Sequence, residues 1–543
     1  MSKQVKMAIS SLAVPATFVA YRYARVLDRQ SRLPTMPLDI FSKLSSTQTD
    51  PQIEDSSGSK KKRVIVIGGG VVGVTAAYKL AKSGKQVVIL EPRSQPGKEC
   101  SACAAGGMQR SNPVVDRSTW ISVLQCMSPL PVWLGGPKEN FRFFHQNYGE
   151  TISDPFFLRW IYTFTMTSIF PDAHQAEKRV EQLKFTKYAV DDMVRMMEDS
   201  EDPMAKVSGY NKRGSVSISY DSILEEEDDE SSTKKISPTS KMSYEPSRSI
   251  DASELFQIEP SVRLMKVAPT SAKYEDEAKA ANSERFTLEL ARRCVEDREL
   301  DVSIEYNTCV KATTSSINKA GKSQIVQLHT NRGIIKVPND VKVLVAAGAW
   351  TSHVLALMEL YAPVYPLKGY SMTVSAKEAL KGNPQLKLED LPSRIVSDKY
   401  LYTSRLGDDI RITSIGEFGG WDTKPTPDAD AEFRRESLSR MPHLAPLINK
   451  VSTRCGHRPY VSDGLLLLGR IPSHENLFVS VGPGSNGWKL AMGSGDIIDR
   501  LMDGQSKEQI QAEYGFDVGA LDPAGRVVFS PIFSRLCRAR WNI

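Results

Sequence analysis

The stretch that most restricts the fold runs from Arg63 to Glu91 and reads RVIVIGGGVVGVTAAYKLAKSGKQVVILE. Two apolar runs flank a run with helical periodicity, so the segment predicts a strand, a tight turn, a helix and a second strand. Gly68, Gly70 and Gly73 form a GxGxxG pattern between the first strand and the helix. The first glycine permits the turn, the second admits a pyrophosphate to the backbone, and the third lets helix and strand pack closely. The unit predicts a Rossmann-like α/β fold that binds a dinucleotide.

An acidic residue, Glu91, closes the second strand of this unit. Its carboxylate can accept hydrogen bonds from ribose hydroxyls and would repel a 2′-phosphate, which disfavours NADP. The N-terminus of the predicted helix offers N–H groups and the positive end of its dipole to the phosphates. The predicted cofactor-binding residues in this unit are Gly68, Gly70, Val71, Val72, Gly73, Glu91, Pro92 and Arg93.

A second glycine-rich turn lies near the other end of the chain, in ENLFVSVGPGSNGWKLAMGSGDIIDRLMDG. This segment reads as a strand, a turn and a helix, and an NAD enzyme has no need for it. A helix N-terminus at this place can direct its dipole at a reduced, anionic flavin ring. The pattern therefore favours FAD over NAD, with predicted contacts from Gly482, Gly484, Ser485, Gly487 and Trp488.

With these motifs the chain resembles the FAD-dependent D-amino-acid dehydrogenases, within the wider family of D-amino-acid oxidase, glycine oxidase and sarcosine oxidase. The likeness runs from Arg63 to about Gly504. It rests on the fingerprint through Glu91, on ECSACAAGG, on PVYPLKGYS, and on GHRPYVSDGLLLLGR with the following NLFVSVGPGSNGW. The sequence departs from the usual dehydrogenase pattern at Pro483, Ala104 and His457, where His, Asn and an apolar residue are common.

The resemblance implies further cofactor contacts. ECSACAAGG corresponds to the segment that runs under the flavin, which adds Ser101, Ala102 and Gly106. Val310 corresponds to a position whose backbone contacts the adenine. The segment VKVLVAAGAWTS reads as a buried strand ending in a glycine turn, and its Ala347, Gly348 and Trp350 complete the predicted cofactor-binding set.

Arg458 is the predicted ligand of a substrate carboxylate. A guanidinium matches a carboxylate bidentately, and related glycine oxidase-like proteins use the arginine of the corresponding motif. The alternative is a structural ion pair with Asp463. Tyr370, near Lys368 in PLKGYS, is predicted to hydrogen-bond substrate, with packing as its alternative. His457 completes the predicted catalytic set in a positional role, because hydride transfer from a neutral amine needs no base.

The predicted fold class is α/β: a Rossmann-like FAD-binding domain with an interleaved substrate domain built on an antiparallel sheet. Its 543 residues, 41% of them hydrophobic, suit two connected domains. We assign 63–125, 282–355 and 455–505 to the FAD-binding domain, 126–281 and 356–454 to the substrate domain, and 506–543 to a C-terminal tail. The acidic, Ser-rich stretch 222–249 is predicted to be a disordered insertion between a strand and a helix near Ala252. Residues 151–170 are interpreted as a core helix, the alternative being a surface helix that touches a membrane or partner.

The first 62 residues are interpreted as a targeting segment and a linker. Residues 1–32 carry six Lys and Arg against the single acid Asp28, with an apolar run from Met7 to Tyr21. This composition is typical of a mitochondrial transit peptide, and a membrane anchor is the alternative. Because much of the net charge of +6 lies there, the charge gives no reason to expect nucleic-acid binding.

The seven scattered cysteines do not describe a disulfide framework and indicate a reducing compartment. Cys100 and Cys103 form a CxxC, but no second pair follows, so we expect no zinc or other metal site. They are interpreted as small buried residues near the cofactor, with a redox role as the alternative.

The sequence thus predicts an FAD-dependent oxidoreductase that oxidises the C–N bond of a small, D-amino-acid-like substrate. Oxygen, a quinone or an electron-transfer flavoprotein would accept the electrons, and peripheral membrane association is considered. Two alternatives stay open: a sarcosine or dimethylglycine type of amine dehydrogenase, and a non-catalytic FAD-fold factor that assists assembly of a mitochondrial respiratory complex.

Overall fold

The computed structural model describes residues 24–42, 44, 61–113, 148–170, 175–220, 241–243, 246–319 and 321–541. Its first layer is a six-stranded sheet in the order β19-β20-β12-β1-β2-β8. Five strands run parallel: β1 (Arg63–Ile67), β2 (Gln86–Leu90), β8 (Val302–Glu305), β12 (Val341–Val345) and β20 (Leu477–Val481). β19 (Leu467–Arg470) is antiparallel at one edge. The expected Rossmann-like unit is therefore present.

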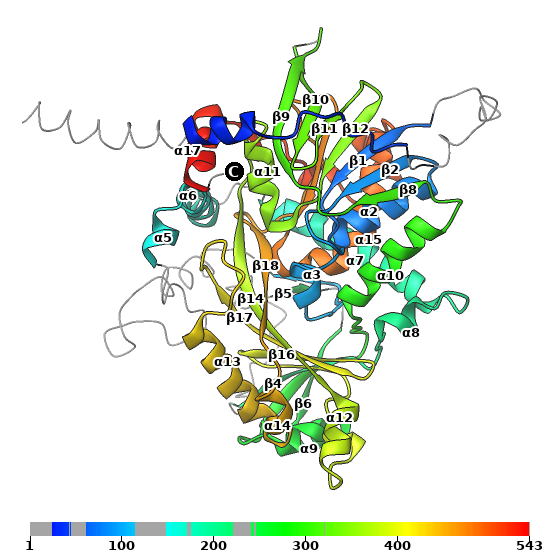
Figure 1. Cartoon of the computed structure of the whole chain (residues 1–543). Coiled ribbons are helices and arrows are strands. Elements are labelled where there is room, and N and C mark those ends of the chain that lie inside the picture. Colours follow the sequence, from blue (N-terminus) through cyan, green and yellow to red (C-terminus); the bar gives the residue numbers. More distant parts are fainter. Residues whose placement is uncertain are drawn as a thin grey trace, which may run out of the picture.

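This sheet is covered on both faces, which explains why β1 and β2 are apolar at nearly every position. Val64 and Val66 point into a core shared with α2 (Val71–Lys82), α7 (Gln175–Glu198), α10 (Ser283–Glu296) and α15 (Gly487–Met502). Ile65 and Ile67 point into the opposite core, against a three-stranded antiparallel sheet of β9 (Val310–Ile317), β10 (Ser323–Thr330) and β11 (Ile334–Lys336). Figure 1 shows the six-stranded sheet between these two layers.

A second sheet of eight strands extends away from the first, in the order β18-β14-β17-β16-β15-β4-β7-β6. It contains the predicted strands around 363–376 and 409–416, which are β14 (Val364–Ser375) and β17 (Asp409–Glu417). All its neighbouring pairs are antiparallel except β15 with β4. The remaining strands are β4 (Ser215–Ser219), β6 (Arg248–Asp251), β7 (Ser271–Glu275), β15 (Ile395–Ser397), β16 (Leu401–Leu406) and β18 (Arg454–Val461).

Helices cover this second sheet toward its outer end. Between strands lie α12 (Ala376–Gly382), α13 (Pro427–Arg440) and α14 (Ala445–Ile448), whose apolar side chains form one core with β14 and β17. α9 (Ala252–Ile258) packs in a separate core with β4, β6 and β7. It begins at the residue predicted from the sequence, and its N-cap Asp251 accepts a hydrogen bond from the Glu254 N–H.

The structure changes several expected segment limits. β18 pairs with β14 in the eight-stranded sheet, so the C-terminal part of the six-stranded sheet begins at β19 instead of residue 455. α7 packs on α15, although 126–281 was assigned to the other domain. The predicted insertion 222–249 is too long at its end, because β5 (Lys241–Ser243) and β6 are strands. Residues 221–240 lie outside the described residues.

The linker expected at 33–62 and the expected start of the folded protein at Arg63 also need correction. The Leu38 N–H donates to the Ile334 carbonyl at 2.9 Å, and Ile40 and Leu44 are buried against the three-stranded sheet. This short segment therefore contributes to the core, although its Ser- and Pro-rich composition hides the two apolar anchors.

The C-terminal 506–543 segment is largely folded. It contains α16 (Lys507–Tyr514), β21 (Val528–Phe529), which pairs with β13 (Leu360–Tyr361), and α17 (Pro531–Trp541). α17 packs against α11 (Thr351–Ala356) and α6 (Pro155–Ile169). The predicted helix within 151–170 is confirmed as α6. Its Phe156, Phe157, Trp160 and Phe164 are buried.

Candidate cofactor and substrate site

A cavity of about 580 Å³ follows the ends of four parallel strands of the six-stranded sheet. It is bordered by the residues just after β1, β2 and β12 and by the last residues of β20. The carboxyl ends of parallel strands are where open α/β sheets bind their ligands. The position of the cavity therefore agrees with the prediction from the glycine pattern.

The glycine-rich loop is fixed by two side chains. The Gly69 N–H donates to Glu91 Oε2 at 2.8 Å, and the Val71 N–H donates to Ser101 Oγ at 3.1 Å. Gly70 has φ −72°, and a Cβ added there would meet only Ser101 Oγ, at 3.6 Å. The space in front of Gly70 is thus open to a ligand, as a pyrophosphate requires. Gly73 fits a different role, because a Cβ there would collide with the Gly68 carbonyl.

Glu91 is buried at the rim of the same cavity. Its Oε1 accepts from the Arg93 N–H at 2.9 Å. Burial raises the pKa of Glu91, and the two backbone N–H donors of Gly69 and Arg93 oppose that rise. Each carboxylate oxygen keeps a second lone pair for a ribose hydroxyl. The residues present therefore fit FAD at this end.

The C-terminal glycine-rich turn closes the other side of the cavity. Helix α15 packs on α2, where the Thr75 hydroxyl donates to the Ala491 carbonyl at 3.0 Å. Gly495 permits this approach, because its Cβ would lie 3.0 Å from the Ala76 Cα. Trp488 Nε1 donates to the Gly106 carbonyl at 3.1 Å, which joins the turn to the ECSACAAGG segment. Segments some 380 residues apart in the chain thus form one site.

Most predicted cofactor residues line the cavity. They are Gly68, Gly70, Val71, Val72, Glu91, Pro92, Arg93, Ser101, Val310, Ala347, Gly348, Trp350, Gly482, Gly484, Ser485, Gly487 and Trp488. Gly73, Ala102 and Gly106 do not line the cavity; they lie behind its lining residues. Cys100 lines the cavity, as expected for a residue near the cofactor. The lining side chains that sequence reasoning missed include Glu99, Thr308, Lys311, His353, Trp421, Pro459 and Ser480. Ser480 has a buried hydroxyl without a hydrogen-bond partner, a donor that a ligand can use.

Arg458 lies next to the ECSACAAGG segment, on the strand face opposite to that of the cavity-lining His457 and Pro459. Its guanidinium covers Gly369, whose added Cβ would lie 2.6 Å from Arg458 Nη2. Burial lowers the pKa of Arg458, and the Cys100 and Cys103 thiols are its electrostatic neighbours. No carboxylate of the described residues pairs with this guanidinium.

The structural alternative for Arg458 was a pair with Asp463. That carboxylate instead binds Arg526 through two contacts, Nε to Oδ2 at 2.8 Å and Nη2 to Oδ1 at 2.7 Å. Arg458 is therefore a half-buried cation that lacks an anion among the described residues. Even a partly buried charge without a partner is costly, so an anionic ligand would be favoured here.

A second cation, the buried Arg411 on β17, supports the same segment and was not predicted. Its Nη1 donates to the carbonyls of Ala102 at 2.9 Å and Ala104 at 3.1 Å. Its Nε has no hydrogen-bond partner, and burial lowers the pKa of the guanidinium. The eight-stranded sheet thus holds the cavity floor at Cys100–Ala104 and places a positive charge behind it. A lone arginine on a regular strand gives no sequence signal for this role.

The position of Tyr370 favours packing over contact with substrate. Its hydroxyl donates to Glu417 Oε2 at 2.6 Å and accepts from the Thr426 N–H at 2.9 Å. Lys368 Nζ lies 3.1 Å from the same Glu417 oxygen. Both side chains are buried, and neither lines the cavity. This network instead ties β14 to the loop that follows β17.

His457 does line the cavity and is fully buried. Its Nδ1 lies 3.6 Å from Glu99 Oε1, and its Nε2 lies 3.2 Å from the Asp422 carbonyl. Burial lowers the pKa of His457 to about 4 and raises the pKa of Glu99. Glu99 also pairs with Arg93. At neutral pH the imidazole is therefore uncharged, which agrees with the positional role predicted for it.

Cys100 and Cys103 form the short helix α3 (Cys100–Cys103), and Cys100 lines the cavity. Burial raises the pKa of Cys100 to about 12 and that of Cys103 to about 11. Both thiols therefore stay protonated at neutral pH, which favours the packing interpretation over redox chemistry. Within the described ranges no three His, Cys, Asp or Glu side chains cluster as metal ligands.

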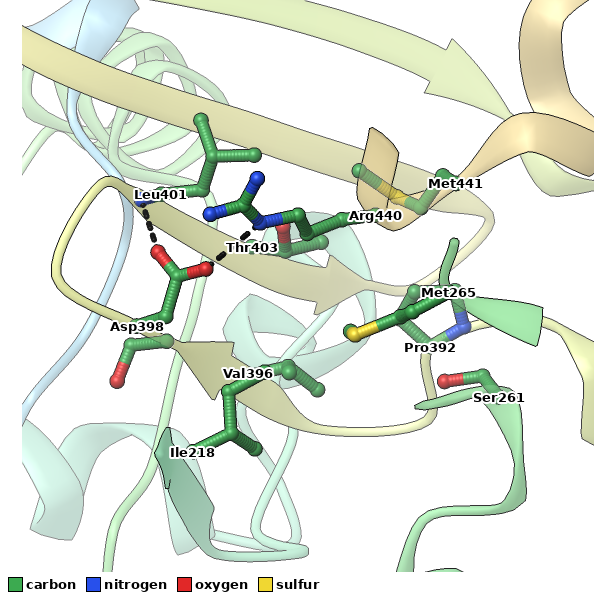
Figure 2. A pocket seen from close by; sticks show the side chains of 11 residues that line it. Ile218, Ser261, Met265, Pro392, Val396, Asp398, Leu401, Thr403, Arg440 and Met441 are labelled. Atoms are coloured by element: carbon green, nitrogen blue, oxygen red, sulfur yellow. Dashed lines mark hydrogen bonds and ion pairs between the residues drawn. The ribbon is translucent and has the colours of Figure 1, made fainter. Parts of the chain in front are cut away.

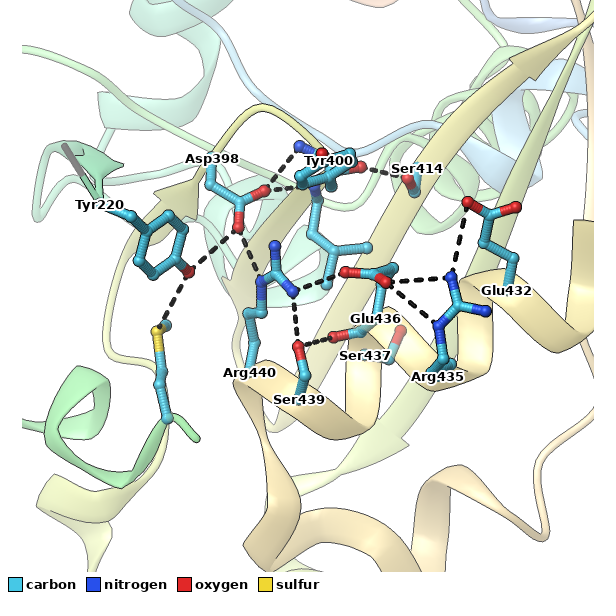
Figure 3. Close-up of polar contacts among 12 residues, drawn as sticks. Tyr220, Asp398, Tyr400, Ser414, Glu432, Arg435, Glu436, Ser437, Ser439 and Arg440 are labelled. Atoms are coloured by element: carbon cyan, nitrogen blue, oxygen red, sulfur yellow. Dashed lines mark hydrogen bonds and ion pairs between the residues drawn. The ribbon is translucent and has the colours of Figure 1, made fainter. Parts of the chain in front are cut away.

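A second, much smaller cavity lies in the eight-stranded sheet. It measures about 20 Å³, room for one water, and is lined mainly by Ile218, Met265, Val396, Leu401 and Met441 (Figure 2). The polar side chains of its wall already have partners within the protein. Asp398 accepts a hydrogen bond from Arg440 Nε at 2.8 Å and another from the Tyr220 hydroxyl (Figure 3). This ion pair anchors the end of α13, and we assign no ligand to the cavity.

Comparison with known proteins agrees with this geometry. The family described as FAD dependent oxidoreductase matches residues 63–501. D-amino acid dehydrogenase 1 of Mesorhizobium japonicum is 25% identical over 454 residues, which cover 82% of this chain and 97% of the relative. D-amino acid dehydrogenase of Bradyrhizobium diazoefficiens is 24% identical, with coverage of 82% and 96%. The crystal structure of glycine oxidase from Geobacillus kaustophilus shares the fold, with a TM-score of 0.54, 18% identity, and coverage of 85% and 98%.

Proposed function

The chain belongs to the FAD dependent oxidoreductase family, and from this premise we propose that it oxidises the C–N bond of a small, D-amino-acid-like substrate. The substrate would lose a hydride from Cα and a proton from its neutral amine. The resulting imine would be hydrolysed to a 2-oxo acid and ammonia. Similarity to D-amino acid dehydrogenases over most of the chain supports the amino-acid class.

The observation that carries the proposal is the unpaired guanidinium of Arg458. It is half-buried beside Cys100, which lines the cofactor cavity, while Asp463 is bound by Arg526. A substrate carboxylate would supply the missing anion and could bind bidentately. This requirement distinguishes an amino acid from a simple amine.

When bound, FAD would supply the hydride acceptor. The chain's own residues bind and orient the substrate. Arg458 would hold the carboxylate, and Arg411 keeps the floor segment in place through the carbonyls of Ala102 and Ala104. The neutral imidazole of His457 would shape the cavity wall without adding charge. A partly buried, positively charged surrounding favours substrates that carry a carboxylate.

Arg458→Ala tests this assignment in the FAD-loaded protein. A charge-assisted contact of this type is worth roughly 2–4 kcal/mol, so kcat/KM for the best amino acid should fall by on the order of 10²-fold or more. Arg458→Lys should not rescue fully, because it loses the planar fork. The substrate panel comprises D-amino acids, glycine, sarcosine and proline, with anaerobic bleaching of the flavin absorbance as the readout.

Arg454 provides a matched control on the same strand. Its guanidinium pairs with Glu284 at 3.1 Å, away from the proposed anion. Arg454→Ala should therefore leave substrate preference unchanged. Amines without a carboxylate should be poor substrates and should lose little further in Arg458→Ala. An equal loss for both substrate classes would make Arg458 a structural residue. Absence of bleaching with every substrate would instead refute the oxidase or dehydrogenase function.

Localisation, electron acceptor and membrane association are also proposals. We propose that residues 1–45 direct the protein to mitochondria, on the basis of their Arg-rich composition. A reporter fused to these residues should enter mitochondria, and a cytosolic or secreted reporter would reject this. The electron acceptor is proposed to be oxygen, a quinone or an electron-transfer flavoprotein, which reoxidation rates with each would separate. We also propose that the protein associates peripherally with a membrane.

A further inference from the structure

The N-terminal arm, which we define as residues 24–42 with Leu44, is hydrogen-bonded to the three-stranded sheet (Figure 1). Its Met36 carbonyl accepts from the Ile334 N–H at 2.9 Å, and its Leu38 N–H donates to the Ile334 carbonyl at 2.9 Å. Ile334 begins β11, which is an edge strand of that sheet. The arm therefore supplies partners to backbone groups at a strand edge, which would otherwise be left unpaired.

Three apolar side chains anchor the arm. Residues 24–31 form a helix, and its Val26 is 1% exposed. Ile40 and Leu44 are 1% and 3% exposed and belong to the apolar core between the six-stranded and three-stranded sheets. Whether a terminal segment tolerates removal depends on the burial and hydrogen bonding of its own residues. By both criteria the arm is part of the folded domain.

The turn between β10 and β11, next to the point where the arm pairs, holds a wall of the cofactor cavity. Arg332 Nη1 donates to Thr308 Oγ1 at 2.9 Å, and the Cys309 N–H donates to Asn331 Oδ1 at 2.7 Å. Thr308 and Cys309 both line the cavity. The Thr308 N–H in turn donates to the carbonyl of Glu91, the predicted ribose ligand, at 2.9 Å. Contacts thus continue from the arm to the adenosine end of the predicted FAD site.

A second contact joins the arm to the same end of the cavity. Gln30 Nε2 donates to the Lys311 carbonyl at 3.4 Å. Lys311 and the preceding Val310 line the cavity, and Val310 is the residue predicted to contact the adenine. The arm therefore reaches this wall through its helix as well as through the segment paired with β11.

The structure divides the stretch that composition assigns to a removable leader. Residues 24–32 of that stretch belong to the arm. Residues 1–23 contain three basic residues and no acidic residue, so they keep the basic, acid-free composition of a leader without the arm. A cut within the arm would instead remove buried side chains or the two hydrogen bonds to Ile334. The fold therefore separates a segment that can be lost from one that the cofactor domain uses.

We propose that the N-terminal arm stays in the mature protein and supports the adenosine end of the FAD site, so that any proteolytic processing of the N-terminus ends before Ala24. The proposal goes beyond the oxidation of an amino acid, because it concerns how the cofactor is held. It also does not depend on a mitochondrial address, because cofactor affinity and the mature N-terminus can be measured wherever the protein resides.

The first test loosens the arm in the full-length protein by the double substitution Ile40→Ser with Leu44→Ser. Titration of the apoprotein should give a Kd for FAD raised by about tenfold, which corresponds to weakening one or two hydrogen bonds at the cavity wall. The Kd for ADP, a probe of the adenosine end, should rise with it, while the Kd for FMN should not change. Met36→Ser is the matched control, because this side chain of the arm is 74% exposed. It should bind both probes like the native protein.

Leu38→Pro provides a milder variant if the double variant does not fold. It removes one donor to the Ile334 carbonyl and leaves both buried anchors in place, and it should weaken ADP binding in the same direction. Equal weakening of ADP and FMN binding would mean a general loss of stability and would overturn the role at the adenosine end. Unchanged ADP binding in the folded arm variants would overturn it as well.

The second test concerns processing. A chain that begins at residue 24 should bind FAD and ADP like the full-length protein, whereas a chain that begins at residue 45 should show the raised Kd values. Mass spectrometry of the protein isolated from its own cells should find the mature N-terminus at or before Ala24. A mature N-terminus beyond Ala24 would overturn the proposal. A cytosolic location would reject only the mitochondrial address and would leave these measurements as they are.

Discussion

Gly70→Val should separate cofactor binding from folding. Gly70 has an ordinary φ of −72°, so valine meets no backbone strain there. A Cβ at this position would meet only Ser101 Oγ, at 3.6 Å, and the rest of the side chain would extend into the cavity. The variant should therefore fold as an apoprotein, while its side chain occupies the space that a pyrophosphate needs.

The magnitude follows from the contacts that would be lost. Displacing a pyrophosphate from the loop removes at least two hydrogen bonds to a charged group, worth about 1.5–3 kcal/mol each. A loss of about 3–6 kcal/mol raises the Kd for FAD by roughly 10²- to 10⁴-fold. The native protein should be purified yellow, with FAD that heat or acid releases intact, and Gly70→Val should be purified colourless.

The assay compares flavin absorbance per protein with urea unfolding of the two apoproteins. Gly382→Val is a control glycine with open space and no positive φ, at the end of α12 and away from the cavity. It should keep its FAD. Gly73→Val should fail differently, by misfolding, because its Cβ collides with the Gly68 carbonyl. Full FAD content in Gly70→Val would refute the assignment of this loop to the pyrophosphate.

Two further predictions concern buried charge. Arg411→Met should lower the free energy of unfolding by about 1.5–3 kcal/mol and reduce FAD retention, because the Ala102 and Ala104 carbonyls lose a charged donor; unchanged FAD retention would contradict its role at the cavity floor. Burial lowers the pKa of His474 to about 4, so the folded protein keeps this imidazole neutral while the unfolded chain protonates it below about pH 6.5. Its contribution to stability is thus present above that pH and is lost toward pH 4, at about 1.4 kcal/mol per pH unit, and His474→Asn should make urea unfolding less pH-dependent in this window.

Local patterns selected residues that lie together around one cavity. Gly68, Gly70 and Glu91 act within one βαβ unit, where spacing along the chain determines position in space. Arg458 was found through a motif, but its lack of a carboxylate partner depended on Arg526, which lies 63 residues from the Asp463 that it binds. No local sequence pattern predicts which arginine pairs with Asp463.

The missed residues share a physical reason. Arg411 stands on a regular strand, and its function comes from carbonyls 309 and 307 residues away in the chain. Likewise, Ile40 and Leu44 are two apolar residues in a polar stretch, too few to give a periodic signal. For Tyr370 the motif left both substrate contact and packing open, and only the fold shows that its hydroxyl is bonded to Glu417 and the Thr426 N–H.

The packing of α15 on α2 has a consequence for the biosynthesis and folding of the protein. The glycine-rich loop leaves the ribosome about 400 residues before the wall formed by Ser480 to Trp488. An incomplete chain therefore has the fingerprint without the cavity. Because a ligand stabilises only the state that binds it, FAD selectively stabilises chains whose C-terminal helix has docked. A cell short of flavin would accordingly accumulate complete but loosely closed chains, exposed to proteolysis at the join between the first and last segments of the cofactor-binding sheet.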